Sequence, residues 1–492
     1  MRFRHDPEGL RLPVKLDSTT NGEFEPAPLA RRDRQAIALA QQSATENARR
    51  TGMSRRQFMI SSCGAANVLM ALNAAGAAAG EIGGVFALAP DAAVDPAAAA
   101  ATLASDDFIF DVQNHAVNPT GPWRRRASGL RLARSMRGAT DAGKTWTAAD
   151  DELGYLNLLD GEHYVKDVFL DSDTQMAVMS VLSVDHDDEP LPIQDAAAVR
   201  ALVDRLGSGR RLLLHGKILP NHAGDLDRME AFKTQWGVSA WKLYTQLPGE
   251  GSRGYRLDDE ALMTPFVEKS RRLGIDIVCA HKGFRFGSGD PAFATCHDVG
   301  RAARLYPDMK FLIYHGGYDK DGIEGPYDPD KAEIGINTLV KSLQDNGIAP
   351  NANVYAELGA TWRQLMTRPD QAAHAWGKLL KHVGEDNVLW GTDCIWYGSP
   401  QDQIQAFRAF QFSESFRERH GYPELTPALK AKIFGLNAAR VYKVDVPGTR
   451  RRLDRDALSL AREGYLAEAD PSFLTYGPKS MAEFRALQRS GH

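Results

Sequence analysis

Hydrophobic and polar positions follow two alternating patterns from Asp106 onward. Short runs of β-branched and apolar residues, typical of buried strands, are separated by longer stretches with the spacing of amphipathic helices. The predicted strands cover residues 108–112, 176–184, 211–215, 238–244, 275–281, 310–315, 353–358 and 388–393. Helices between them are expected at residues 196–206, 258–273, 291–306, 330–345 and 371–383.

Eight strands, each followed by a helix, predict an α/β fold of the (β/α)8 TIM barrel type. A doubly wound sheet is the alternative, and the number of units alone does not exclude it. No G-x-G-x-x-G sequence opens the first unit, which weakens that alternative. The stretch at about residues 118–161 is too long for an ordinary connection and predicts a lid over the barrel mouth.

The composition is that of a soluble globular protein, with 43% hydrophobic and 25% charged residues in a chain of 492. The first 89 residues hold 11 Lys and Arg against 8 Asp and Glu, so with a total charge of −4 the remainder carries −7. A body this acidic has no electrostatic reason to bind nucleic acid. Four cysteines without a CxxC pair argue against a disulfide scaffold and a cysteine zinc ribbon.

The first 105 residues contain a candidate export signal. Residues 54–59 (SRRQFM) resemble the twin-arginine signal, and a run rich in Ala, Gly and Met follows, charged only at Glu81. This run is too weakly hydrophobic to span a membrane. No stable membrane span is expected in the chain that remains after its removal. Residues 87–89 (ALA) are the first candidate cleavage site, and residues 77–79 are the alternative. We therefore expect an exported, periplasmic protein with the twin-arginine export machinery as a partner, and a leader outside the fold.

Seven polar side chains fall at the carboxyl ends of the predicted strands, where barrel enzymes carry their functional groups. They are His115, His215, Lys242, His281, His315, Glu357 and Asp393. Gln113 and His115 are two residues apart, so both side chains can point at one site. Asp393 would supply an oxygen ligand beside the imidazoles.

Four motifs resemble, in order, the signatures of the amidohydrolase-related family, which includes aminocarboxymuconate semialdehyde decarboxylase and gamma-resorcylate decarboxylase. They are residues 111–115 (DVQNH), 280–283 (AHKG), 313–317 (IYHGG) and 389–393 (LWGTD). Residues 436–442 (LNAARVY) also resemble a stretch near the family's end. The resemblance covers about residues 106–445 and implies a barrel of the metal-dependent hydrolase type, which leaves residues 446–492 as a helical C-terminal extension.

The resemblance further implies a divalent metal, most often zinc, bound by Gln113, His115, His281 and Asp393. It gives His315, together with Asp393, the role of moving a proton. Family members often have His-x-His on the first strand, and relatives of gamma-resorcylate decarboxylase have Glu-x-His. This chain has Gln113 in the first place of the pair. Because an amide oxygen binds metals more weakly than imidazole or carboxylate, we expect Gln113 to be a marginal ligand.

Lys242, His215 and Glu357 are expected to line the substrate pocket. Lys242 stands where two-metal amidohydrolases carry a carbamylated lysine, but the interrupted histidine pair favours one metal. Basic residues near the mouth, which also include Lys282 and Arg285, favour a small anionic substrate. The expected reaction is metal-dependent hydrolysis of a C–N or C–O bond.

Two alternatives to hydrolysis stay open. One is non-oxidative decarboxylation of an aromatic or unsaturated acid, which needs the same ligands. The other is a non-catalytic binding protein whose metal site has decayed, with Gln113 as the sign of decay. Assembly as a homo-oligomer is compatible with the sequence under each interpretation.

Overall fold

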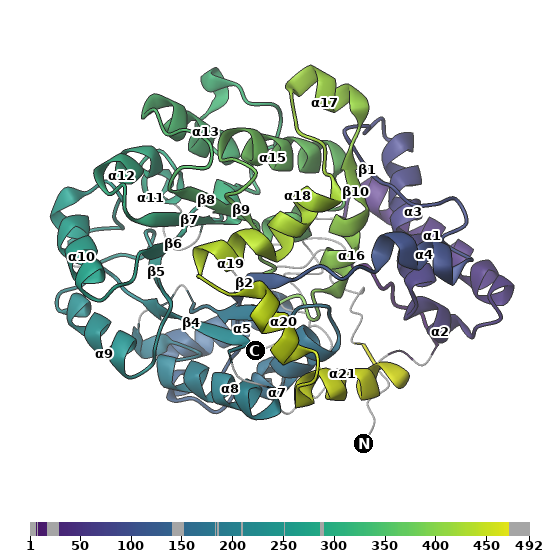
Figure 1. Cartoon of the computed structure of the whole chain (residues 1–492), viewed down its shortest axis with the longest axis horizontal. Coiled ribbons are helices and arrows are strands. Elements are labelled where there is room, and N and C mark those ends of the chain that lie inside the picture. The colour runs from purple at the N-terminus through teal and green to yellow at the C-terminus, as the bar shows by residue number, and fades with distance from the viewer. Residues whose placement is uncertain are drawn as a thin grey trace.

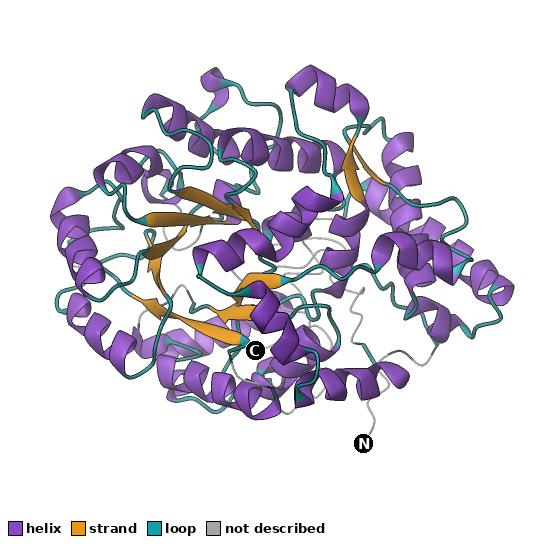
Figure 2. Cartoon of the chain, viewed as in Figure 1, coloured by secondary structure: helices purple, strands orange, loops and turns teal. Residues whose placement is uncertain are grey.

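A computed structural model describes residues 6, 8–16, 29–139, 152–182, 184, 186–207, 210–249, 251–285 and 290–471. Eight parallel strands follow one another in chain order around a single sheet, with helices outside them (Figures 1 and 2). The strands are β2 (Phe110–Asn114), β3 (Met176–Met179), β4 (Leu212–Lys217), β5 (Ala240–Tyr244), β6 (Ile277–His281), β7 (Lys310–Tyr314), β8 (Val354–Glu357) and β9 (Val388–Leu389). All eight predicted strands are therefore present, with shifted ends.

Backbone hydrogen bonds close this sheet between β2 and the chain that follows the short strand β9. Val112 N donates to Trp390 O over 3.0 Å, Asp393 N to Gln113 O over 3.0 Å and His115 N to Cys394 O over 2.5 Å. A closed sheet with strands in sequential order is the (β/α)8 barrel that the pattern predicts, and it excludes the doubly wound alternative.

Helices cover the barrel and its two ends. They are α5 (Ala127–Ala139), α7 (Gly161–Tyr164), α8 (Ile193–Leu206), α9 (Arg228–Thr234), α10 (Glu260–Arg272), α11 (Pro291–Ala294), α12 (Val299–Leu305), α13 (Ile336–Asp345), α14 (Thr361–Leu365), α15 (Pro369–His382), α16 (Gln401–Ala409), α17 (Glu414–His420), α18 (Pro427–Ala431), α19 (Asn437–Val441), α20 (Val446–Leu453) and α21 (Ala457–Ala467). The prediction of one helix over 291–306 was wrong, because Thr295 is extended and ends α11. Asp298, between the two helices, instead accepts bonds from Leu257 N and Lys282 Nζ, both 2.8 Å long.

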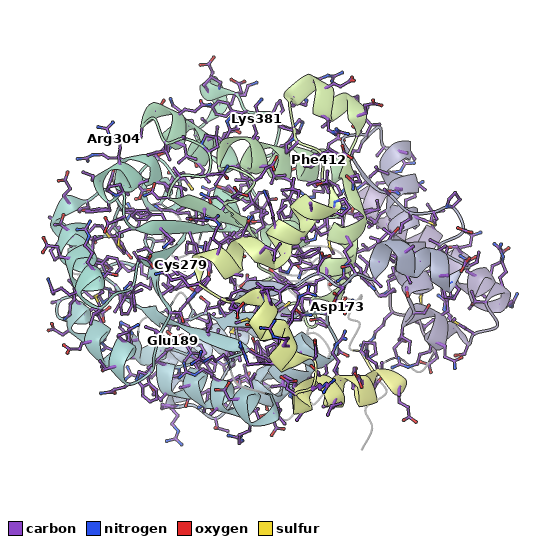
Figure 3. All side chains as sticks on the ribbon, viewed as in Figure 1. Asp173, Glu189, Cys279, Arg304, Lys381 and Phe412 are labelled. Carbon is purple, nitrogen blue, oxygen red and sulfur yellow. The ribbon has the colours of Figure 1, made fainter. Side chains whose placement is uncertain are left out.

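The barrel interior is filled by the inward side chains of the strands. Val112, Val178, Leu312 and Leu389 are buried there together with Cys279, which is labelled in Figure 3. Residues of α19 join the same cluster and cover one end of the barrel. The four cysteines of the chain are all buried and unpaired, in agreement with the absence of a disulfide scaffold.

The segment before the barrel forms a helical layer on one side of it (purple in Figure 1). It contains α1 (Arg31–Arg50), α2 (Arg55–Met59), α3 (Ser62–Ala78), β1 (Gly84–Phe86) and α4 (Pro96–Leu103). Helix α3 packs on α1 and has 11 of its 17 residues buried. Strand β1 pairs antiparallel with β10 (Phe410–Phe412), so the expected leader is packed onto the barrel domain in this structure.

Part of the expected lid lies outside the described residues, namely 140–151, as do residues 472–492 of the expected C-terminal extension. The described part of that extension is helical, in α20 and α21. Within the described ranges, none of the helices combines the length and apolar character needed to cross a membrane.

The packing of β1 can be tested at Gly84. A Cβ at this position would lie 2.4 Å from the Phe410 ring and 2.8 Å from Pro369 O. Gly84→Ala should therefore lower the free energy of unfolding by about 1–3 kcal/mol, the usual cost of overpacking. The neighbouring Val85→Ala, at a side chain that is 40% exposed, is the matched control. Thermal unfolding of both variants measures the effect, and equal midpoints would contradict the packing of this segment.

Candidate active site

The candidate site lies where the barrel strands end, and its backbone is strained there. His315, Ala360 and Asp393 follow β7, β8 and β9 and have φ values of +65°, +57° and +61°. Residues other than glycine adopt such left-handed conformations at a cost of about 1 kcal/mol or more. Such strain at three neighbouring strand ends marks them as candidate functional positions.

A buried carboxylate joins the first barrel strand to the segment after the last. Asp111 Oδ1 accepts bonds of 3.1 Å from Gln113 N and from Thr392 N, and its Oδ2 accepts from the Thr392 hydroxyl. Burial raises the pKa of Asp111 to about 6, although these donors oppose the shift. The clamp fixes the position of Asp393, the residue after Thr392, relative to β2.

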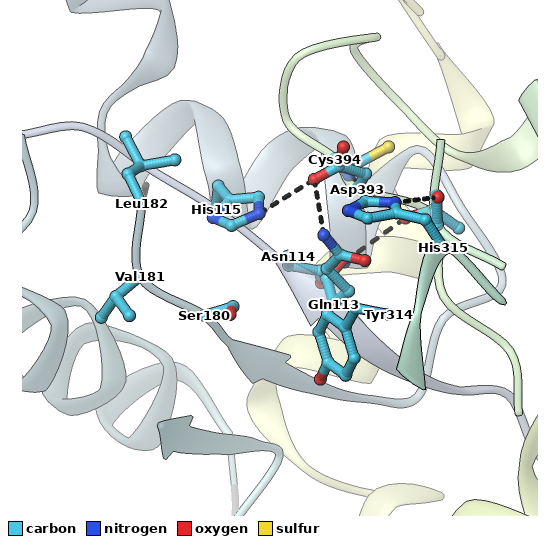
Figure 4. Close-up of polar contacts among 12 residues, drawn as sticks. Gln113, Asn114, His115, Ser180, Val181, Leu182, Tyr314, His315, Asp393 and Cys394 are labelled. Carbon is cyan, nitrogen blue, oxygen red and sulfur yellow. Dashed lines mark hydrogen bonds and ion pairs between the residues drawn. The ribbon is translucent and has the colours of Figure 1, made fainter. Parts of the chain in front are cut away.

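Asp393 contacts both predicted ligands of the first strand. His115 Nε2 lies 2.9 Å from Asp393 Oδ1, and Gln113 Nε2 donates to the same oxygen over 3.0 Å (Figure 4). The Gln113 amide thus turns its nitrogen, not its oxygen, toward the carboxylate. In this arrangement Gln113 orients Asp393 rather than competing with it for a ligand position.

His281 and His315 form the other half of the site. Their rings are edge to face with centroids 4.6 Å apart. His281 Nε2 donates to Phe284 O over 3.0 Å and His315 Nδ1 to Gly359 O over 2.6 Å. Because a carbonyl oxygen only accepts, the bonded nitrogen of each ring carries a hydrogen, and the other nitrogen is Nδ1 of His281 and Nε2 of His315. Burial and then Lys242 lower the pKa of His281 to about 3, so its ring is neutral.

Glu357 lies directly beside His315. Its Oε2 accepts the His315 backbone N–H over 3.1 Å, and its Oε1 accepts from Gly359 N. Burial raises the pKa of Glu357 to about 8 against the effect of these bonds. Gly391 is required next to it, because a Cβ there would lie 1.7 Å from Glu357 Oε1. Glu357 therefore supports the backbone of His315 and holds a proton near neutral pH.

The predicted basic residues occupy different surroundings. Lys242 is fully buried, with Nζ 3.4 Å from the centre of the Tyr314 ring and 5.2 Å from that of Tyr244. Lys282 is paired with Asp298 at 2.8 Å, and both side chains are fully buried. Arg285 is paired with Asp319 and Asp321. The ion pairs of Lys282 and Arg285 weaken the argument that these two residues attract an anionic substrate.

His215 lies deeper in the barrel than the other predicted residues. It pairs in register with Ala240, the first residue of β5, whereas His281 pairs with Tyr244, the last. Its Nε2 is 3.0 Å from Tyr442 OH and its Nδ1 is 3.2 Å from Ser180 Oγ. Burial lowers the pKa of His215 well below its ordinary value. These contacts place His215 in the barrel interior, between Ser180 and Tyr442.

The donor chemistry at the mouth fits a divalent metal. His115 Nε2 and Asp393 Oδ1 are 2.9 Å apart, the length of a hydrogen-bonded ion pair. Two ligands of one tetrahedral zinc ion at about 2.0–2.2 Å lie about 3.4 Å apart, so a bound metal would replace this direct contact. The buried His115 Nδ1 has no hydrogen-bond partner, and His281 has its Nδ1 lone pair set by the Phe284 carbonyl. Among the described side chains, however, no group of three or more His, Cys, Asp or Glu residues lies close enough together to hold a metal ion.

Several functional neighbours were not predicted from the sequence. Asp111 and Thr392 form the clamp, and Trp396 stacks on His115 with ring centroids 5.4 Å apart. Phe284 packs edge to face against His315 at 4.9 Å. The DVQNH motif contains Asp111 two residues before Gln113, so its spacing is a signal that could have identified it.

Several solved structures resemble the chain. An uncharacterised TIM-barrel protein from Bordetella bronchiseptica is 14% identical, with a TM-score of 0.41 over 68% of this chain and 99% of that one. 4-Oxalomesaconate hydratase from Rhodopseudomonas palustris is 18% identical, with a TM-score of 0.41 over 73% and 100%. 5-Carboxyvanillate decarboxylase from Novosphingobium aromaticivorans, complexed with manganese, is 13% identical, with a TM-score of 0.39 over 69% and 96%.

The comparison by sequence family is the decisive one. Comparison with curated proteins finds no match. The family model described as amidohydrolase matches residues 110–444, which span the barrel from β2 through α19. This range contains every predicted site residue from Gln113 to Asp393. The chain therefore belongs to the amidohydrolase family, a family of enzymes.

Proposed function

We propose that the protein is a metal-dependent hydrolase that cleaves a C–N or C–O bond of a small substrate. The observation that carries this proposal is the contact of 2.9 Å between His115 Nε2 and Asp393 Oδ1 at the barrel mouth. Family membership supports hydrolysis as the reaction class. The ligands are His115, His281 and Asp393, and Gln113 holds the Asp393 carboxylate in place.

A divalent metal bound by these residues supplies Lewis acidity, which polarises a carbonyl group and lowers the pKa of water. The protein supplies orientation and proton transfer. His315 accepts and returns a proton at Nε2, because Nδ1–H is held by Gly359 O. Glu357 fixes the His315 backbone through Oε2. The aromatic side chains of Trp396 and Phe284 keep water away from the rings of His115 and His315.

Zinc is the metal we propose. Its preferred set of imidazole nitrogens and a carboxylate oxygen is the set available at this mouth. The related decarboxylase with bound manganese makes Mn²⁺ the second ion to test. Lys242 and Glu357 remain the residues proposed to line the substrate pocket, with the Lys242 ammonium 3.4 Å from the centre of the Tyr314 ring.

Decarboxylation of an aromatic acid is the second candidate function. It is favoured by the aromatic rings around the site, where Trp396 faces His115 and Phe284 faces His315. Assay of the zinc-loaded and manganese-loaded protein against lactones, amides and aromatic acids separates the two. New carboxylate without CO2 supports hydrolysis, whereas CO2 release supports decarboxylation. Tight ligand binding without turnover of any compound would favour a binding protein.

We also propose that the protein is exported to the periplasm by the twin-arginine machinery. The SRRQFM sequence and the run after it, charged only at Glu81, support this proposal. Arg55 donates to Gly9 O and Arg56 to Asp6 O, so both arginines have partners once the chain is folded. Replacing both arginines by Lys keeps the charge and should stop export, as fractionation would detect. The substrate is a small molecule, and no nucleic acid is expected as a partner.

His281 should be essential for metal binding and Gln113 should not. His281→Ala removes one of three ligands and should empty the site, whereas Gln113→Ala removes only a bond to Asp393 and should retain most of the metal. Zinc content after dialysis against a weak chelator measures both effects. His374→Ala, at a buried histidine on α15, is the matched control. Equal loss from the Gln113 and His281 variants would make glutamine a full ligand.

Glu357 should make the stability of the metal-free protein depend on pH. Its pKa rises from 4.5 to about 8 on folding, so the folded state holds this proton more tightly. The corresponding stabilisation is complete below about pH 4.5 and is lost as the pH rises to about 8. Between these pH values, Glu357→Gln should reduce the slope of the unfolding free energy against pH by up to about 1.4 kcal/mol per pH unit. The exposed Glu463→Gln is the control, and parallel curves for wild type and Glu357→Gln would refute the raised pKa.

A further inference from the structure

The first described segment of the chain reaches into the barrel domain. Leu12, Val14 and Leu16 are almost fully buried, although they precede the barrel by about 90 residues. Between them, Lys15 N donates to Asp402 Oδ2 over 3.0 Å, and Lys15 Nζ donates to Ser399 O over 2.8 Å. Nζ also lies 3.2 Å from Asp402 Oδ1, and the two side chains are only 2% and 1% exposed. This is a buried ion pair between the N-terminal segment and the beginning of α16.

The partners of Lys15 stand at the far end of the segment that starts at Asp393. Residues 393–400 connect the candidate ligand to α16. Trp396 in this segment stacks on His115, and the backbone of Cys394 binds His115 N. The near end is fixed by the Asp111 clamp on Thr392. The Lys15–Asp402 pair and the bond to Ser399 O fix the other end.

We infer that Lys15 is a positioning residue for the metal site, acting through the segment 393–400. The inference rests on the proposed metal-dependent function. A buried lysine that binds both a carboxylate and a carbonyl holds these two groups together more rigidly than apolar packing does. The N-terminal segment that carries it is then a working part of the enzyme and remains attached to it. Cleavage after Ala89 would remove Lys15 together with β1, whose neighbour Ala87 donates to Ala409 O over 2.7 Å.

The test compares zinc affinity in full-length wild type, Lys15→Met and Lys15→Arg by competition with a chelator. Lys15→Met should weaken zinc binding by up to about 10-fold, the lower end of the effect of removing a partner that bonds a ligand directly. Lys15→Arg should restore the affinity to within a few-fold of wild type, because a cavity of about 180 Å³ beside Lys15 has room for a guanidinium. Arg211→Met, which breaks the buried pair with Asp456 at the start of β4, is the matched control and should leave zinc affinity unchanged.

A double variant keeps the test valid if Lys15→Met does not fold. Lys15→Met combined with Asp402→Leu leaves no unpaired charge in the interior and should fold, yet should still bind zinc weakly. Wild-type zinc affinity in the single or the double variant would overturn the inference. So would an active, zinc-containing enzyme whose intact mass shows that it begins at Pro90. Failure of the wild type itself to bind zinc or manganese would instead refute the proposed function.

Discussion

The buried Asp111 carboxylate is the interaction on which the candidate site depends. It holds Thr392 by both the backbone and the hydroxyl, and so it brings the end of the last barrel strand against the first. Asp393 and His115 meet at 2.9 Å across this closed seam. The cost of burying the charge is visible in the pKa of Asp111, which rises to about 6. Three donated hydrogen bonds, one from Gln113 and two from Thr392, offset part of that cost.

Burial also decides the charge of groups at the site. It lowers the pKa of His281 to about 3, which leaves a neutral imidazole, the form that binds metals. It raises the pKa of Glu357 to about 8, and the nearby Asp393 carboxylate adds to this shift. Lys242 opposes it, with its ammonium against the face of Tyr314. Burial away from water thus favours a neutral imidazole on His281 and a protonated carboxyl on Glu357, beside the Lys242 ammonium.

Much of this could be predicted from the sequence, and the rest could not for identifiable reasons. Eight apolar runs predicted eight strands, and residues at their ends gave His115, His281, His315 and Asp393. A two-residue period does not encode how deep a residue lies inside the barrel, so the sequence could not show that His215 contacts Tyr442. Lys282 and Arg285 looked available for a substrate because their partners Asp298 and Asp319 are distant in sequence.

The composition of the N-terminal segment is compatible with two interpretations, an export signal that is removed and a helix that stays buried in the fold. An export signal must be mildly apolar and accessible to the export machinery, whereas a core helix must be apolar and buried in the folded protein. Helix α3 has the composition that both require, and the sequence alone does not distinguish them. What the structure adds is complementarity. Asn73 on this helix exchanges two hydrogen bonds with the backbone of Phe86, and Gly84 fits against Phe410 without room for a Cβ. Specific contacts of this kind are expected of a permanent layer, whereas a leader bound for removal needs none.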